Sequence, residues 1–213
     1  METVKRPAEQ KVILHDVSWE TYERLLADGA DSSAPRFTYD RGELEIMSPS
    51  PEHEKLNRRI AQLVMAFAEE TGVEAEDFGS TTFRREDLER GFEPDSCFYI
   101  QNEERVRGKD RIDLAVDPPP DLVIEVDITH PSLNKLSIYA LIGVPEVWRY
   151  DGQRLTILKL SGDSYVEAAN STALARLTSV VLTDFVDKSK SMRHTAWLKE
   201  VREWVRERAG QTD

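Results

Sequence analysis

The chain of 213 residues is 39% hydrophobic and 32% charged, with a formal net charge of −12 at pH 7. This length supports one well-covered core, and the absence of a linker argues against two domains. Without a low-complexity tract, disorder is expected only at the termini. No apolar run approaches the roughly 18 residues that span a bilayer, and the single cysteine, Cys97, excludes an intramolecular disulfide and a cysteine-rich zinc site. We expect one cytoplasmic domain over residues 1–213 with no membrane partner, and the acidity counts against a broad nucleic-acid-binding surface.

The first predicted elements are a short helix and a hairpin. Ser18 is a candidate N-cap for a helix from Trp19 to about Ala27. Two strands, over about 37–40 and 43–47, follow it and form a hairpin. The second strand alternates apolar with acidic residues, namely Leu44 and Ile46 with Glu43 and Glu45.

A long amphipathic helix is predicted next, over about residues 52–70. Its apolar positions recur at helical spacing: Leu56, Ile60, Leu63, Val64 and Phe67. The first turn carries His53 and Glu54. A glutamate there complements the helix dipole and a histidine is commonly a surface or capping residue, so an accessory role for either in a functional site is the alternative interpretation.

Residues 121–126 are predicted to be the central strand, because their near-continuous apolar character fits a strand covered on both faces. Shorter strands are predicted before it, over about 73–78, 80–84 and 96–100. A helix over about 132–141 follows it, and this helix leads into the next strand.

The last part of the chain is predicted to be an antiparallel meander followed by a helix. The strands are expected over about 147–150, 155–160 and 165–168. An amphipathic helix over 193–208 carries a stripe with two tryptophans, which suits the domain's own core better than a dimer contact. The crossover unit and the antiparallel ends together predict an α/β or α+β fold with a mixed sheet.

Acidic residues and a lysine converge in principle at the carboxyl end of the central strand. Glu125 and Asp127 stand two residues apart and point to the same face, because strand side chains alternate. Asp95 opens an earlier strand, and Lys135 lies one turn into the following helix. An unpaired buried charge costs several kcal/mol, so these carboxylates need a partner, and a divalent metal ion is one candidate.

Asp95 and Glu125 would offer oxygen ligands from neighbouring strands to one Mg²⁺ or Mn²⁺ ion. Such an ion accepts a substrate phosphate, which suits hydrolysis of a phosphodiester. Lys135 would position the nucleophile or neutralise developing charge. The alternative, which spacing alone favours, is that the acids are ordinary rim charges and Lys135 is a solvated helix residue.

Several short motifs occur in a specific order. They are Met47-Ser48-Pro49-Ser50 with His53, Pro94-Asp95, Asp121-Leu122-Val123-Ile124-Glu125-Val126, Lys135 to Tyr139, and Gly143-Val144-Pro145-Glu146-Val147-Trp148. This order resembles the Uma-type family of predicted restriction endonucleases, part of the PD-(D/E)XK nuclease superfamily, over about residues 18–170. The resemblance implies a restriction-endonuclease-like fold, a mixed β-sheet flanked by helices, and it makes a homodimer an expectation.

By this resemblance Asp95 belongs to the PD element and Glu125 is the second acid. The chain departs from the superfamily signature because no lysine stands two residues after Glu125; the family pattern points instead to Lys135. Asp127 has three alternatives: a further metal ligand, an ion-pair partner that holds Lys135, or a residue that caps the approach to the helix.

The leading hypothesis is a Mg²⁺- or Mn²⁺-dependent endonuclease that cleaves DNA with Asp95, Glu125 and Lys135. A catalytically inactive binding or assembly module with the same fold is the alternative, and a hydrolase for a small phosphorylated substrate is a third interpretation. The distribution of charged residues around the two acids would distinguish these hypotheses. A nuclease is expected to gather basic residues near the two acids, drawn from Arg58, Arg59, Arg84 and Arg107.

Overall fold

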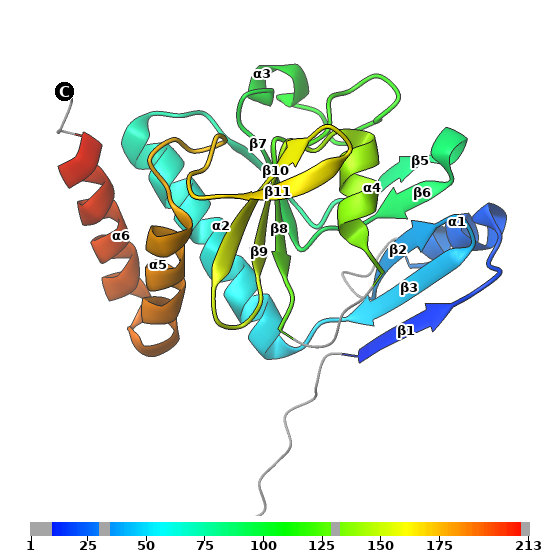
Figure 1. The fold of residues 1–213 in the computed structure, drawn as a ribbon, viewed down its shortest axis with the longest axis horizontal. Helices are drawn as coiled ribbons and strands as arrows, with labels where there is room; N and C mark the ends of the chain where they lie inside the picture. Colours follow the sequence, from blue (N-terminus) through cyan, green and yellow to red (C-terminus); the bar gives the residue numbers. More distant parts are fainter. Residues whose placement is uncertain (1–9, 30–34, 129–132, 210–213) are drawn as a thin grey trace, which may run out of the picture.

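The computed structural model describes residues 10–29, 35–128 and 133–209, and they form two β-sheets with flanking helices (Figure 1). In chain order the elements are β1 (Gln10–Leu14), α1 (Trp19–Asp28), β2 (Arg36–Asp40), β3 (Glu43–Ser48), α2 (Pro51–Thr71), β4 (Glu76–Gly79), β5 (Phe83–Arg85), the 3-10 turn η1 (Glu86–Leu88), β6 (Arg90–Phe92), β7 (Ser96–Tyr99), α3 (Glu103–Val106), β8 (Leu122–Val126), α4 (Lys135–Ile142), β9 (Glu146–Tyr150), β10 (Leu155–Ser161), β11 (Ser164–Ala168), α5 (Ser179–Ser191) and α6 (His194–Ala209).

The larger sheet has six strands in the order β11-β10-β9-β8-β7-β4. The β8 and β9 strands are parallel and are joined through α4, whereas the other neighbouring strands are antiparallel. The predicted central strand, the crossover unit and the C-terminal meander are therefore confirmed. The sheet is mixed, as the sequence predicts, because a parallel pair needs a crossover while the meander needs only tight turns.

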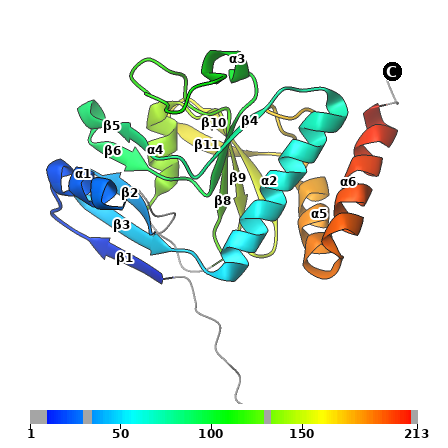
Figure 2. The same cartoon turned by 180° about the vertical axis from the view of Figure 1, so that it is seen from behind.

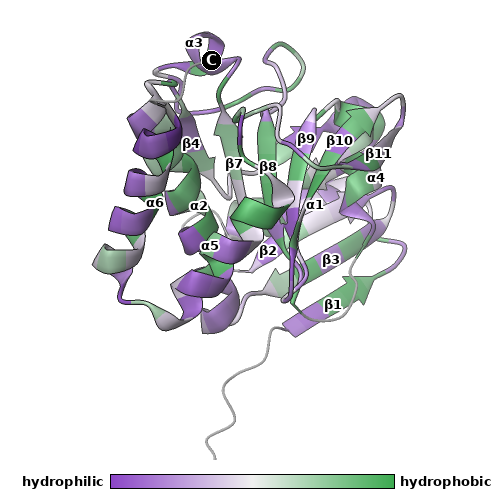
Figure 3. Ribbon diagram, turned by 60° about the vertical axis from the view of Figure 1, so that its left-hand side comes forward, coloured by the Kyte–Doolittle hydropathy of each residue, from purple (hydrophilic) through white to green (hydrophobic). Residues whose placement is uncertain are grey.

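Both faces of β8 are covered. Leu122 and Ile124 pack into one hydrophobic core with α2, α5 and α6, and Val123 packs into a second core with Tyr139 of α4. All three strand side chains are fully buried, and each such burial contributes about 1.5–3 kcal/mol. Figure 2 shows α2, α5 and α6 together on one side of the sheet, and Figure 3 shows the hydrophobic residues gathered where helices and strands meet.

The smaller sheet is antiparallel and has the order β1-β3-β2-β6-β5, with α1 packed on it. The predicted hairpin belongs to this sheet and not to the central one. Tyr22 of α1 lies against Gly91 of β6 so closely that a Cβ atom at Gly91 would stand 2.1 Å from the tyrosine oxygen. Only glycine fits there without displacing the ring.

Some elements differ from the prediction. The elements β1, β6 and α5 were not predicted, because β6 is too short and the patterns of β1 and α5 are too weak. The helix expected from about Ser132 begins at Lys135 in the described part of the chain, so Lys135 is its first residue and does not lie one turn inside it. Residue 132 itself lies outside the described residues.

The C-terminal helix is confirmed as α6, and its stripe faces the core. Trp197 is buried in the domain's own core, as expected, where it packs with residues of α2 and α5. Figure 1 shows α6 at one end of the molecule and β1 at the other. Among the helices of the described residues, none has both the length and the apolar character needed to cross a membrane.

Candidate active site

The predicted site residues meet where the two sheets approach the first turn of α2. Asp95 directly precedes β7, and Glu125 lies on β8. The register pairs Ser96 with Ile124, so the antiparallel order brings Asp95 and Glu125 alongside each other. Lys135 opens α4 after the loop that leaves β8. The structure therefore brings together the three residues that the sequence predicts as catalytic.

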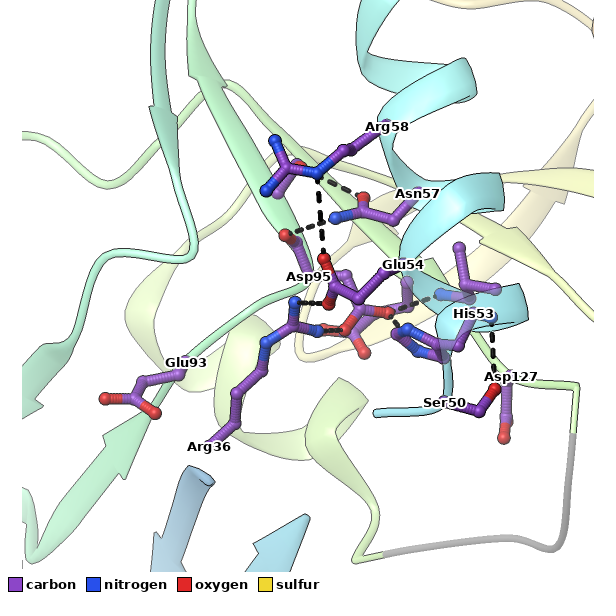
Figure 4. Close-up of polar contacts among 12 residues, drawn as sticks. Arg36, Ser50, His53, Glu54, Asn57, Arg58, Glu93, Asp95 and Asp127 are labelled. Carbon is purple, nitrogen blue, oxygen red and sulfur yellow. Dashed lines mark hydrogen bonds and ion pairs between the residues drawn. The ribbon is translucent and has the colours of Figure 1, made fainter. Parts of the chain in front are cut away.

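Asp95 is enclosed by protein groups (Figure 4). Its side chain is 1% exposed and forms an ion pair through Oδ1 with Arg36 of β2. Its Oδ2 accepts a hydrogen bond of 2.7 Å from the Val126 amide and lies 3.1 Å from His53 Nε2. The backbone carbonyl of Asp95 accepts a 2.8 Å hydrogen bond from Asn57 of α2. Both carboxylate oxygens are thus occupied within the fold.

Glu125 is held by two residues of α4. Its Oε2 accepts a 2.9 Å hydrogen bond from Lys135 Nζ, and its Oε1 accepts one from the Tyr139 hydroxyl. The side chains of Glu125 and Lys135 are 14% and 10% exposed. Because Lys135 and Tyr139 are one helical turn apart, they lie on the same face of α4 and both reach the strand end.

The electrostatics of the two carboxyl groups differ. Burial alone would raise the pKa of Asp95, but the hydrogen bond and charge of His53, with the Lys135 and Arg36 cations, outweigh it and lower the pKa to about 2. Burial raises the pKa of Glu125; the Lys135 cation opposes that shift and the Asp95 carboxylate adds to it. Burial would lower the pKa of Lys135, but the Glu125 and Asp95 carboxylates raise it above its ordinary value.

Asp127 lies just beyond β8 and holds two other cations. Its Oδ2 accepts a 2.6 Å hydrogen bond from Arg149 of β9, and Lys11 Nζ of β1 lies 3.8 Å from its Oδ1. The ion pair of Lys135 is with Glu125, so the prediction that Asp127 holds Lys135 is wrong. The capping alternative is also wrong, because Asn134 occupies the N-cap position of α4.

His53 and Glu54 stand in the first turn of α2, where the Ser50 side chain caps the helix by accepting a 3.2 Å hydrogen bond from the His53 amide. His53 is fully buried against Asp95 and is not a surface residue. Glu54 pairs with Arg36 and lies 4.0 Å from Arg58. Both predicted accessory residues are therefore close to the site, and Arg36 links Glu54 to Asp95.

Two further charged residues of the site were missed from the sequence. Arg36 is the first residue of β2, one position before the predicted strand, and no local pattern there indicates that it reaches Asp95. Glu45 of β3 is 1% exposed, although its strand alternates polar with apolar residues. Its Oε2 accepts a 2.9 Å hydrogen bond from the Leu133 amide just before α4, and its charge contributes to the raised pKa of Lys135.

The basic residues expected near the acids are mostly elsewhere. Arg58 comes closest, through Glu54. Arg84 pairs with Glu23, and Arg107 pairs with Glu103. Arg59 stacks over the Trp197 ring. The cations at the site are instead Arg36 and Lys135, together with Arg149 and Lys11 beside Asp127.

A cavity of about 230 Å³ opens beside Glu125. It is also lined by Asp127, Lys135 and Tyr139, with Lys11 and Arg149 at its border. Asp95 does not line it, because the surrounding groups cover its carboxylate. A ligand in this cavity would contact Glu125 directly. The groups that enclose Asp95 would separate that carboxylate from the ligand.

The donor set suits a hard divalent cation. Glu125 accepts one hydrogen bond on each oxygen, so a lone pair remains on each. Asp127 Oδ1 is a buried oxygen that accepts no hydrogen bond within the described part of the chain. In the same part, no three side chains of His, Cys, Asp or Glu converge as a complete metal site. The arrangement therefore fits an ion such as Mg²⁺, which takes one or two carboxylates and completes its shell with water and substrate phosphate.

A solved structure has a similar fold. The solved structure of "a putative nuclease belonging to DUF820 from Anabaena variabilis ATCC 29413" matches with a TM-score of 0.54 and 15% identity, covering 80% of this chain and 99% of that chain. The expected restriction-endonuclease-like fold, a mixed sheet flanked by helices, is thereby confirmed.

The chain belongs to the Uma2 family, which is described as "Putative restriction endonuclease" and whose model matches residues 19–187. The predicted resemblance is therefore confirmed, and the match extends beyond the predicted 18–170 into α5. A comparison with curated proteins gives no match.

Proposed function

We propose that residues 1–213 form one nuclease-like domain, with a core over about 18–170 and a C-terminal helix over 193–208, that hydrolyses phosphodiester bonds in DNA as a metal-dependent endonuclease. The observation that carries the proposal is the pair of adjacent carboxylates, Asp95 and Glu125, with Lys135 Nζ 2.9 Å from Glu125. Membership in the family supports the nuclease class.

The proposed cofactor is Mg²⁺, or Mn²⁺ in its place, because restriction-endonuclease-like proteins generally use divalent metal ions. Asp95, Glu125 and Asp127 would hold it. When bound, the ion supplies a Lewis acid for the phosphoryl oxygens and a water of lowered pKa. This assignment is supported by the oxygen-only donor set and by Asp127 Oδ1, which accepts no hydrogen bond within the described residues.

The protein's own residues would supply orientation and charge. Lys135 would direct its ammonium group toward the phosphate oxygens and neutralise the negative charge that develops on them. Tyr139 donates to Glu125 Oε1 and fixes the carboxylate, while Lys135 fixes the other oxygen. This pair of donors favours one orientation of Glu125 at the cavity wall.

His53 and Glu54 are proposed as accessory residues that act through Asp95. His53 Nε2 lies 3.1 Å from Asp95 Oδ2. Glu54 pairs with Arg36, and Arg36 in turn pairs with Asp95 Oδ1. Together they would keep the Asp95 carboxylate ionised and in one rotamer. Neither lines the cavity, so we assign them a positioning role and no contact with substrate.

The first test is cleavage of supercoiled plasmid and of single-stranded DNA with Mg²⁺ or Mn²⁺. We expect the parent protein to cut and Glu125→Gln, which keeps the shape of the side chain, to lose at least about 100-fold in rate. The matched control is Glu167→Gln, an exposed glutamate of β11 that is ion-paired to Arg154. Equal cutting by both variants would point to a contaminating nuclease and would remove support for the proposal.

One observation favours the alternative of an inactive binding or assembly module: both oxygens of Asp95 are already occupied by protein groups. The two functions separate by metal titration calorimetry. If the protein is a nuclease, the parent protein should give a heat of Mn²⁺ binding, and the Glu125→Gln variant should give none. A module would bind DNA without binding the ion at this site and would cut under no metal.

We also propose that two copies associate, because a dimer lets two active sites address the two strands of a duplex. Light scattering of the protein, with and without duplex DNA, tests this directly. A monomeric mass in both conditions would remove the dimer from the proposal and leave the active site unaffected.

A further inference from the structure

The cavity beside Glu125 has a cationic border that the proposed chemistry does not use. Arg149 of β9 and Lys11 of β1 both approach Asp127, Arg149 by a 2.6 Å hydrogen bond and Lys11 at 3.8 Å. They come from different sheets and stand 138 positions apart in the chain. Both therefore meet at Asp127.

The position of Arg149 is set by strand pairing. In the parallel register of β8 and β9, Arg149 stands opposite Glu125, and its side chain borders the same cavity. The side chain is 46% exposed. Only one of its guanidinium nitrogens is engaged by Asp127, and the others make no hydrogen bond within the described residues. A guanidinium presents several donors in a fixed fork, so it can hold Asp127 and an external oxyanion together.

The local charge contrasts with that of the whole chain. Three cationic side chains line the cavity, Lys11, Lys135 and Arg149, against two carboxylates, Glu125 and Asp127. The chain as a whole carries −12. An anion that approaches this acidic protein therefore meets a locally cationic border at this cavity, and Lys135 is already committed to Glu125.

We infer that Arg149 and Lys11 form a binding subsite for a nucleic-acid backbone phosphate next to the one that is cleaved, with Asp127 as the residue that orients them. The inference rests on the proposed function, because the phosphate belongs to the same substrate strand. Asp127 Oδ2 accepts the hydrogen bond from Arg149, and Asp127 Oδ1 lies 3.8 Å from Lys11 Nζ.

A purely structural role is the competing explanation. In that case Arg149 and Lys11 neutralise Asp127 and never touch the substrate. The two explanations differ in salt dependence, because each phosphate contact releases condensed counterions and a contact within the protein does not.

The experiment is fluorescence anisotropy with a labelled duplex and a labelled single strand, in Ca²⁺ to prevent cleavage, across a series of NaCl concentrations. The variants are Arg149→Ala, Lys11→Ala and the double variant. Controls on α6, at the far end of the molecule, are Arg206→Ala and Lys199→Ala, which also remove a cation paired to a glutamate. Thermal unfolding establishes that each variant is folded.

We expect each site variant to weaken binding about three- to fivefold and to lower the salt slope by about 0.9 per lost contact on duplex DNA, with nearly additive slopes in the double variant. The α6 controls should keep the parental slope. Site variants with parental slopes overturn the subsite while leaving the nuclease proposal intact. A parent protein that neither binds nor cuts either DNA removes both.

Discussion

Asp95 and Glu125 are neighbours on adjacent strands, but their surroundings differ. Asp95 is 1% exposed and enclosed by Arg36, His53 and the Val126 amide. Glu125 is held by Lys135 and Tyr139 and borders a cavity of about 230 Å³. The Asp95 side therefore belongs to the interior of the fold, where charges must be compensated, and the Glu125 side is the one that an external ligand reaches first.

This difference predicts that stability depends mainly on the Asp95 side and activity mainly on the Glu125 side. Removing a buried carboxylate that lies between two cationic groups takes away a compensating charge, and the cost of an uncompensated buried charge is several kcal/mol. A carboxylate at a cavity wall can be replaced by an amide at a smaller cost, because water enters the space.

The largest effect is expected from Asp95→Ala. Arg36 and His53 then lose the compensating charge of Asp95, while Arg36 keeps its ion pair with Glu54, and we expect the free energy of unfolding to fall by about 3–5 kcal/mol. Urea denaturation followed by circular dichroism measures it. The comparison variant is Glu125→Gln, which should lose less than about half as much. Equal losses would remove the distinction between the two sides of the site.

Lys135→Gln tests the Glu125 side. We expect cleavage to slow by about 100-fold or more, because the cation beside the phosphate is lost, while Lys135→Arg retains part of the rate. Single-turnover cleavage measures the chemical step apart from binding. If Lys135→Gln loses stability but cuts at the parental rate once folded, Lys135 is structural and Glu125 works without it.

The pH dependence of stability should report the enclosure of Asp95. Its pKa is lowered from 3.8 to about 2 in the folded protein. A carboxyl group whose folded pKa is depressed contributes stability above its unfolded pKa and loses it as the pH falls toward the folded value, here between about pH 4 and pH 2, by about 2 kcal/mol. Unfolding free energies of the parent and of Asp95→Asn should therefore converge at low pH. Parallel curves would mean that Asp95 keeps its ordinary pKa.

The smallest effect concerns Glu45, which joins the smaller sheet to the segment before α4. We expect Glu45→Ala to cost about 1–2 kcal/mol, because the Leu133 amide loses its acceptor, and Glu45→Gln to restore most of it. Chemical denaturation gives both values. The cleavage rate should follow the same order if Glu45 helps to place Lys135, and should stay constant if the hydrogen bond only anchors the loop.

Much of the site followed from local patterns. The apolar run of β8 placed Glu125 at a strand end, and the helix after it placed Lys135 within reach, since a residue in the first turn of α4 lies close to the strand it follows. Asp95 was found because it opens the neighbouring strand. These predictions depend on segments close in sequence or on strands that pair directly.

The rest depends on how the two sheets pack. Arg36 stands 59 positions from Asp95, and no periodicity in the hairpin shows where its side chain will end. Glu45 was expected on an ordinary alternating strand, yet α4 and its preceding segment bury it. The partner of Asp127 was sought in Lys135, which is near in sequence, whereas the structure supplies Arg149 from the adjacent strand.

The sequence by itself determined the central strand, the crossover helix and the family, because hydrophobic periodicity and short motifs are local properties that survive without knowledge of the neighbours. Only the tertiary structure decided which charges compensate one another. The ion pair between β2 and the residue before β7, and the one between β1 and the residue after β8, form because two sheets meet at one place. That meeting depends on the summed packing of all the side chains between them.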